Sequence, residues 1–320
     1  MLEIVTIILP FFGLIGLGYA AGYWRKLPAE GLAWLDFFVF YLALPALFFQ
    51  LIAETPLSRS SNWSFVLLTT FGTYCTFAIA FSIAALINRG NVPVATIQGL
   101  VGSYANTGFM APGLTLAAFG PAAAVPTALI FSFDSAMLFT LLPLMMALGG
   151  TERADPAAIL ATVARSVLLH PFIIATIAGF AVAASGLDLP SPIASLLTLL
   201  RSAAAPCALF ALGVGLALRP PERLAFDLPL LVGIKLFVHP LVVYLVLSWI
   251  GGFDEVWVYT AVLMAALPPA VNVFVVARQY GFYVAGASST ILIGTLVSVV
   301  TVTAILSVIV TGNLPTDPFR

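Results

Sequence analysis

One stretch interrupts an apolar segment that is long enough to cross a bilayer: Gly102-Ser103-Tyr104-Ala105-Asn106-Thr107-Gly108-Phe109-Met110-Ala111-Pro112-Gly113. Pro112 removes a backbone donor and disfavours helical dihedrals at the residue before it. Gly108 and Gly113 loosen the backbone, and Asn106 can cap a new helix start. The stretch therefore predicts a membrane helix that is broken near its middle.

A second interruption of the same kind lies late in the chain, in Ala265-Ala266-Leu267-Pro268-Pro269-Ala270-Val271-Asn272. Two successive prolines stop the helix, and an asparagine again follows. Unpaired backbone at membrane depth is tolerated only where protein or a water-filled cavity surrounds it, and a matching pair of broken spans is typical of a transport site. We expect the two breaks to form one site.

The composition places the whole chain in a membrane. Hydrophobic residues make up 62% of the sequence and charged residues 8%, with a mean hydropathy of +1.12. Ten apolar segments of membrane-spanning length occupy most of the 320 residues, which leaves no room for a soluble domain. They are Glu3–Tyr23, Glu30–Ala53, Trp63–Ile87, Val94–Ala118, Ala122–Leu148, Ala158–Ala184, Pro192–Leu218, Leu228–Ile250, Val256–Ala277 and Tyr283–Val310.

An internal repeat divides these spans into two sets of five. A shift of 161 residues superposes Pro10 on Pro171, Gly18 on Gly179, Pro45 on Pro206, Phe49 on Phe210, Gly72 on Gly233, Gly90 on Gly251 and Gly120 on Gly281. Because five is odd, the second set must cross the membrane upside down relative to the first. We predict a first repeat in 1–149, a cytoplasmic linker in 150–157 and an inverted second repeat in 158–320. The broken spans are then equivalent.

Basic residues set the expected orientation. With both termini on one side, the opposite side receives Arg25, Lys26, Arg89, Arg153, Arg219, Arg223 and Arg278, and the terminal side only Arg59 and Arg320. Cytoplasmic loops are enriched in Lys and Arg. The sequence thus predicts a multi-pass protein of the cytoplasmic (inner) membrane with both termini in the periplasm.

The expected site lies where the second half of each broken span begins. Helix N-termini favour anions, and two of them should converge near midplane. The substrate-binding residues expected there are Asn106, Thr107, Gly108, Pro112, Pro268, Pro269 and Asn272. The alternative is a pair of proline kinks whose free backbone groups are satisfied by neighbouring hydroxyls.

Charged residues deep in the spans are candidates for ion coupling. Asp134 lies near the middle of the fifth span, where an acid must be protonated, paired or in contact with water. Lys235, in the eighth span, is either its counter-ion or a side chain that reaches back to the interface. We expect Asp134 and Lys235 to couple a proton or sodium ion. For Arg201 we expect pairing within the bundle, and for Asp36, Arg165 and His170 a structural or solvated role.

The chain resembles the auxin efflux carrier family of permeases, which includes bacterial malonate or malate transporters. The resemblance rests on Asn106-Thr107-Gly108-Phe109-Met110-Ala111-Pro112, on Leu267-Pro268-Pro269-Ala270 with Ala277-Arg278-Gln279-Tyr280-Gly281, and on the ten-span layout. It implies an all-α fold similar to the bile-acid and sodium/proton antiporter group. In that fold, the first, second, sixth and seventh spans form a scaffold and the other spans form a core that carries the crossing helices.

Together these patterns predict an elevator-type secondary carrier for a small organic anion, such as malonate, malate or an auxin-like acid. Zinc, nucleophile-elbow and phosphate-loop motifs are absent from the sequence, so we expect no enzyme, no metal and no cofactor beyond a coupled proton or sodium ion. Expected partners are the anion and membrane lipid, with no nucleic acid and a homodimer left open. The alternatives are a cation/proton antiporter and a non-transporting membrane sensor of the same fold.

Overall fold

The chain folds as an assembly of helices in the computed structural model, which describes residues 2–25, 28–54, 63–150, 161, 165, 169, 171–186, 189–219 and 224–319. The helices are α1 (Leu2–Arg25), α2 (Ala29–Phe38), α3 (Leu44–Ala53), α4 (Trp63–Ile87), α5 (Val92–Ser103), α6 (Ala111–Phe119), α7 (Ala124–Leu148), α9 (Pro171–Ser185), α10 (Ser191–Ala217), α11 (Leu228–Gly233), α12 (His239–Ile250), α13 (Glu255–Ala265), α14 (Val271–Tyr280) and α15 (Val284–Val310). Short π-helical turns join α2 to α3 and α11 to α12. The described residues form no β-strand beyond one isolated bridge.

Seven helical stretches in this described part are long and apolar enough to cross a membrane. One of them, Ala111–Leu148, has 38 residues. As a straight helix it would measure about 57 Å, nearly twice the thickness of the hydrocarbon core. A 3₁₀ turn bends it at Gly120, whose φ is 70°. The positive φ explains why glycine is needed there and separates α6 from α7.

Most helix ends lie within three residues of the boundaries expected from the sequence. The third predicted span coincides with α4, and the predicted second and eighth spans correspond to α2–α3 and α11–α12. The predicted linker at 150–157 lies outside the described residues except for Gly150. The predicted sixth span is described continuously only from the start of α9.

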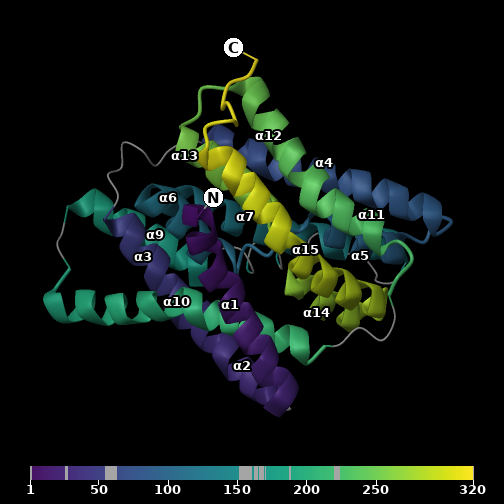
Figure 1. The fold of residues 1–320 in the computed structure, drawn as a ribbon, viewed down its shortest axis with the longest axis horizontal. Coiled ribbons are helices and arrows are strands. Elements are labelled where there is room, and N and C mark those ends of the chain that lie inside the picture. The colour runs from purple at the N-terminus through teal and green to yellow at the C-terminus, as the bar shows by residue number, and fades with distance from the viewer. Residues whose placement is uncertain are drawn as a thin grey trace.

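The helices pack in two groups (Figure 1). In the first group, which we call the scaffold group, α1 packs along α10, α3 packs against α9 and α10, and α2 contacts α10. In the second, the core group, α4 packs on α5, α7 and α12, and α15 packs on α11 and α14. The broken spans α5–α6 and α13–α14 both belong to the core group.

Glycines let helices approach closely within the scaffold group. A side chain at Gly18 of α1 would collide with the carbonyl of Phe210 on α10. A Cβ at Gly179 of α9 would lie 2.9 Å from the carbonyl oxygen of Phe49 on α3. Small residues at such contacts are how membrane helices gain van der Waals packing without a hydrophobic driving force.

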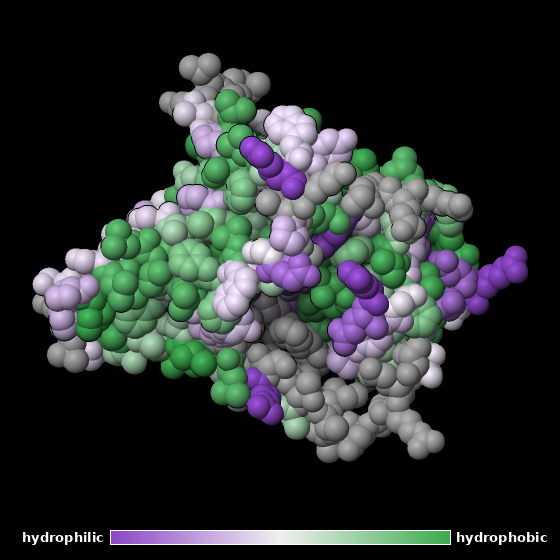
Figure 2. Space-filling model, turned by 90° about the horizontal axis from the view of Figure 1, so that it is seen from below, coloured by the Kyte–Doolittle hydropathy of each residue, from purple (hydrophilic) through white to green (hydrophobic). Residues whose placement is uncertain are grey.

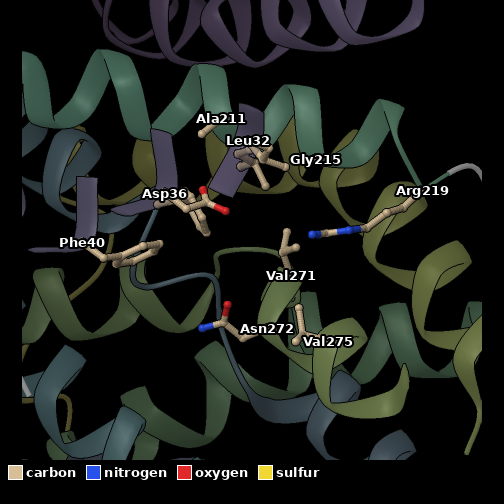
Figure 3. A pocket seen from close by; sticks show the side chains of 11 residues that line it. Leu32, Asp36, Phe40, Ala211, Gly215, Arg219, Val271, Asn272 and Val275 are labelled. Atoms are coloured by element: carbon tan, nitrogen blue, oxygen red, sulfur yellow. The ribbon is translucent and has the colours of Figure 1, made fainter. Parts of the chain in front are cut away.

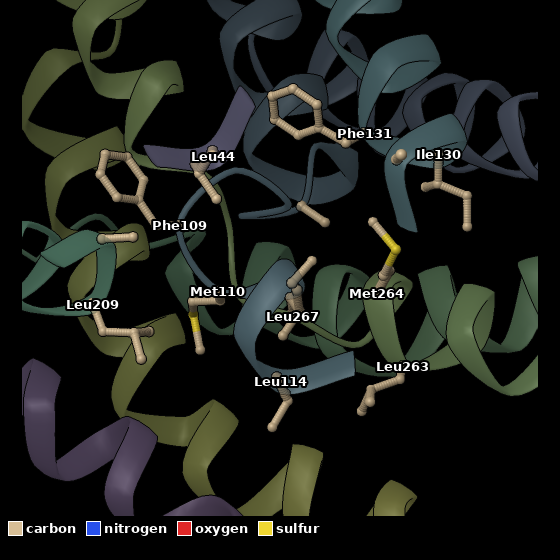
Figure 4. Packing of buried hydrophobic residues seen from close by; sticks show 14 of the residues in the cluster. Leu44, Phe109, Met110, Leu114, Ile130, Phe131, Leu209, Leu263, Met264 and Leu267 are labelled. Atoms are coloured by element: carbon tan, nitrogen blue, oxygen red, sulfur yellow. The ribbon is translucent and has the colours of Figure 1, made fainter. Parts of the chain in front are cut away.

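Apolar side chains fill the space between the groups and cover the outside. Phe109, Met110 and Leu114 pack with Leu263, Met264 and Leu267 in one buried cluster (Figure 4). Many large apolar side chains are exposed. Figure 2 shows hydrophobic residues over the left part of one face, with strongly hydrophilic residues gathered at its centre and right. The hydrophobic part suits contact with lipid rather than water.

Candidate functional site

The two broken spans cross each other through their backbones. The chain leaves the helix between α5 and α6 and between α13 and α14, and there Ala105 and Pro269 form an antiparallel bridge. The Asn106 N–H donates to the Pro268 carbonyl at 2.8 Å, and the Ala270 N–H donates to the Tyr104 carbonyl at 3.0 Å. Each break thus satisfies backbone groups of the other, as non-helical backbone at membrane depth requires. We call residues 104–110 and 266–270 the crossover.

Proline and glycine shape this crossover. Pro268 and Pro269 cannot donate to a helix and hold the second extended piece, whereas Pro112 lies in the first turn of α6, where no donor is needed. A Cβ on Gly108 would lie 3.1 Å from the Phe40 ring and 3.2 Å from the Phe131 ring. A Cβ on Gly294 of α15 would lie 2.8 Å from Cδ of Pro269. Both glycines are therefore packed against the break.

Buried polar groups of the crossover lack partners. Asn106 is 2% exposed; its Oδ1 accepts from the Phe109 N–H at 3.4 Å, within the turn before α6. The expectation that Asn106 caps the new helix is wrong, because α6 begins only at Ala111 and its N-cap residue is Met110. Its Nδ2 and the Thr107 hydroxyl have no hydrogen-bond partner among the described residues. Buried polar groups are nearly always paired, so orphaned ones indicate a place for a ligand or a bound water.

Both second half-helices begin at the crossover. The N-cap residues are Met110 for α6 and Ala270 for α14, and neither offers a side-chain acceptor to the first turn. Helix N-termini without such caps carry free N–H groups and partial positive charge. This arrangement suits an anionic group, as the sequence predicted.

A buried hydrogen-bond network lies beside the crossover and contains both expected coupling residues. The Lys235 ammonium donates to the Ala265 carbonyl at 2.6 Å and contacts Nδ1 of His239 at 3.0 Å. His239 Nε2 lies 3.2 Å from the Thr73 hydroxyl, which donates to Asp134 at 3.4 Å. Ala265 ends α13, so the ammonium sits at the partly negative end of that half-helix.

This network decides whether Lys235 is a counter-ion of Asp134 or a side chain that reaches back to the membrane interface. The side chain is 0% exposed, so the interpretation in which it reaches back to the interface is wrong. Asp134, 3% exposed, is likewise buried and is joined to Lys235 through Thr73 and His239. The structure thus brings the two residues into one network without testing whether they couple an ion.

A cavity of about 230 Å³ opens between the two helix groups (Figure 3). Its scaffold-group wall includes Asp36 and Phe40, and its core-group wall includes Phe109 and Asn272; the full lining is Leu32, Asp36, Phe40, Phe109, Ala211, Leu212, Gly215, Arg219, Val271, Asn272 and Val275. Phe40 and Phe109 meet edge to face with ring centroids 4.8 Å apart, where the cavity adjoins the crossover. Asn272 is exposed, so the cavity reaches the surface beside the start of α14.

The predicted site residues divide between these places. Asn106, Thr107, Gly108, Pro268 and Pro269 lie in the crossover, and Pro112 opens α6 directly after it. Asn272 lies instead on the cavity wall. Two charged residues of that wall, Asp36 and Arg219, were not among the predicted site residues.

Two of the remaining charged residues can be compared with expectation. Arg201 pairs with Glu54 at 3.6 Å, which confirms the expected pairing within the bundle. Arg165 is an exposed residue, and His170 lies outside the described residues. One sequence signal could have identified Asp36 as a site residue, because it is an isolated acid within an apolar span. Its position opposite Arg219 depends on how α2 packs on α10.

The crossed half-helices, the membrane-spanning helices and the cavity between them define an integral membrane protein of the transporter class. Residues 3–306 match the family described as "Membrane transport protein", and the chain belongs to that family. This match confirms the resemblance to auxin efflux carriers. The chain is 48% identical over 319 residues, the full length of both chains, to a protein of Rhizobium meliloti (strain 1021) whose name is "Putative malonate transporter".

Proposed function

We propose that this protein is a secondary carrier that moves a small organic anion, a short carboxylate, across the cytoplasmic membrane. The observation that carries the proposal is the crossover, where α6 and α14 begin without side-chain caps and the Asn106 amide has no partner among the described residues. Phe109 of the crossover and Asn272 of α14 line one cavity. Helix N-termini and amide donors recognise carboxylates. Membership of a transport family supports a carrier rather than an enzyme or a sensor.

The size of the cavity favours a short acid. At about 230 Å³ it is smaller than typical drug-sized ligand sites, which measure about 300–1,000 Å³. The name of the Rhizobium relative contains malonate, a three-carbon dicarboxylate. We therefore place malonate first, malate second and an indole-bearing acid last among the proposed substrates.

We further propose that the chain is an inverted repeat that works as an elevator. The Gly18 contact with Phe210 and the Gly179 contact with Phe49 support the repeat, because the shift of 161 residues maps Gly18 on Gly179 and Phe49 on Phe210. In the proposed motion the core group, with the crossover, slides past the scaffold group. The broken spans fit that role because the substrate groups lie on the moving part.

Ion coupling through Asp134 and Lys235 remains a prediction. The membrane potential favours anion exit by about 2.3 kcal/mol per charge at 100 mV, so uptake needs a co-transported cation. Replacing Asp134 by Asn tests the role: if the residue couples a proton, transport by the variant no longer responds to a pH gradient. A response equal to that of the wild type would contradict it.

Placement in the inner membrane with both termini outward is also a proposal. It predicts that, in a variant lacking Cys75 and Cys207, a cysteine at Thr316 reacts with an impermeant maleimide on intact cells. Protection of that cysteine until the cells are permeabilised would reverse the orientation. The mass of the detergent-solubilised protein decides whether it forms a homodimer.

The experiment that tests the transport proposal is uptake of radiolabelled malonate, malate and indole acetate into proteoliposomes. Wild-type protein should give saturable malonate uptake, and Asn106→Ala should abolish it because the amide is lost from the crossover. Asn313→Ala, in the exposed C-terminal tail, is the matched control and should transport normally. Proton-linked sodium movement without anion flux would instead establish the antiporter alternative, and binding without flux the sensor.

A further inference from the structure

The cavity holds two opposite charges whose roles the proposed carrier does not explain. Arg219, just beyond the C-terminal end of α10, extends into the cavity, and Asp36 projects into it from α2 (Figure 3). No ion pair joins them within the described residues, and the Asp36 Oδ1 atom is buried without a hydrogen-bond partner there. An acid and a guanidinium thus line the same small space without contact between them.

Contacts with the core group hold Arg219 in place. Its guanidinium lies over the ring of Phe274 on α14, 5.2 Å from the centroid, and its carbonyl accepts from the Ser288 hydroxyl of α15 at 2.7 Å. Stacking on an aromatic ring leaves the planar N–H donors of a guanidinium available for a carboxylate. The guanidinium is therefore positioned to bind a carboxylate.

Among the described residues that line the cavity, Arg219 is the one full positive charge. The crossover and Asn272 contribute amides, hydroxyls and helix ends, which are weaker anion partners than a guanidinium. Around Asp36, the charged groups on the described elements are Glu30 on α2 itself, Arg219, and Arg278 of α14, which acts on Arg219 electrostatically. With Asp36 and Arg219 both ionised, the wall carries no net charge.

We propose that Arg219 binds a carboxylate of the substrate and that Asp36 balances the charge of Arg219 across the cavity, without contact, when the cavity is empty. This rests on the proposed carrier and extends it to the residues that recognise charge. The second carboxylate of a dicarboxylate would then face Asn272 and the start of α14, across the cavity from Arg219 (Figure 3). The site thus favours a short dicarboxylate over a monocarboxylate.

The two charges predict opposite effects on affinity. A substrate carboxylate near Asp36 is repelled by it, because two acids in one small space cannot both stay ionised with a single compensating cation. Removing the charge of Asp36 should therefore tighten substrate binding, whereas removing that of Arg219 should weaken it. If the residues formed only a structural pair, both changes would lower stability, and neither would tighten binding.

The test is binding of radiolabelled malonate to the purified protein in detergent, with propionate as the monocarboxylate competitor. Arg219→Gln should raise the Kd about tenfold or more, and Arg219→Lys less, since a lysine keeps the charge but loses the forked donor geometry. Asp36→Asn should lower the Kd by about three- to tenfold. Arg278→Gln, which removes a nearby charge outside the cavity lining, is the control and should change the Kd little.

A pH series adds a second readout. Lowering the pH protonates Asp36, so wild-type affinity should rise as the pH falls, and this rise should be smaller in Asp36→Asn. Titration of malonate itself is common to both proteins and cancels in the comparison. Equal pH profiles, or weaker binding by Asp36→Asn, would overturn the role of Asp36.

The outcomes separate this inference from the carrier proposal. If the wild type binds malonate and Arg219→Gln binds it equally well, the inference fails and the carrier stands. If the wild type binds neither malonate nor malate, the carrier proposal fails and takes the inference with it. Thermal unfolding of each variant identifies loss of folding, and the tighter binding expected of Asp36→Asn cannot arise from misfolding.

Discussion

At the scale of single residues, Lys235 is the most informative side chain because it is fully buried and charged. Its ammonium binds the last carbonyl of α13 and His239, and Asp134 is joined to it through Thr73. Burying a charge is costly unless it is paired and hydrogen-bonded. The network therefore has a value for stability that is independent of any role in transport.

Replacing Lys235 by Met should lower the free energy of unfolding by about 3–5 kcal/mol, because Asp134 would keep a buried charge without its cation. Equilibrium unfolding in detergent measures the change. Asp134→Asn should recover part of the loss in the Lys235→Met background, since it removes that charge. Strictly additive effects would show that the two residues are not linked.

The exposed ion pair of the scaffold group provides the control for this prediction. Arg201 and Glu54 are 3.6 Å apart, with 32% and 59% of their side chains exposed. Exposed pairs contribute about 0–1 kcal/mol, so Arg201→Met should change the free energy of unfolding by no more than that. If Arg201→Met lowered the free energy of unfolding as much as Lys235→Met does, burial would not be the cause of the larger effect.

The sequence predicted the crossover residues well and the cavity charges poorly. Asn106, Pro268 and Pro269 stand out because amides and prolines are out of place in an apolar span. Asp36 was expected to have a structural or solvated role, and Arg219 was expected only to mark the cytoplasmic side. Their meeting depends on how α2 and α10 pack, and no local pattern encodes that packing.

At the scale of elements, helix bounds follow closely from apolar length and from proline and glycine. The breaks at the crossover and the turn at Gly120 were all foreseeable, because each places a helix-breaking residue at a fixed point. The π-helical turns Val39–Ala43 and Ile234–Val238 were not foreseen. A proline follows each turn by two residues, Pro45 and Pro240, and disturbs the helical hydrogen bond to the carbonyl four residues earlier, which lies inside the turn.

The contact of α15 with the crossover predicts an effect of a single glycine. Gly294→Leu should place side-chain atoms against Pro269, displace the crossover, and lower stability by about 1–3 kcal/mol while abolishing malonate uptake. Proteoliposome uptake and unfolding in detergent measure the two effects.

The same substitution at an open position is the matched control. No atom lies within 4 Å of a Cβ built on Gly16 of α1, which is exposed. Gly16→Leu should therefore leave uptake intact and change stability by about 0.5 kcal/mol or less. Normal uptake by Gly294→Leu would show that the packing of α15 on the crossover is not needed for transport.

At the scale of the whole molecule, the two helix groups together form the site. The crossover lies in the core group, and the cavity lies where that group meets α2 and α10 of the scaffold group. A solute in the cavity therefore touches both groups, and relative movement of the groups would change which side of the membrane it faces. The ten-span repeat remains a prediction, since seven helical stretches of the described residues are long and apolar enough to cross a membrane. The grouping of the helices was implied only by family resemblance.

The most direct measurement of the central claim is counterflow, because it needs neither a known coupling ion nor a known direction. Proteoliposomes loaded with unlabelled malonate are diluted into a trace of labelled malonate. A carrier that alternates its site between the two sides should accumulate label transiently above equilibrium, and Asn106→Ala should not. Label that only approaches equilibrium, or does not enter, would contradict a carrier and leave a channel or a sensor as the explanation.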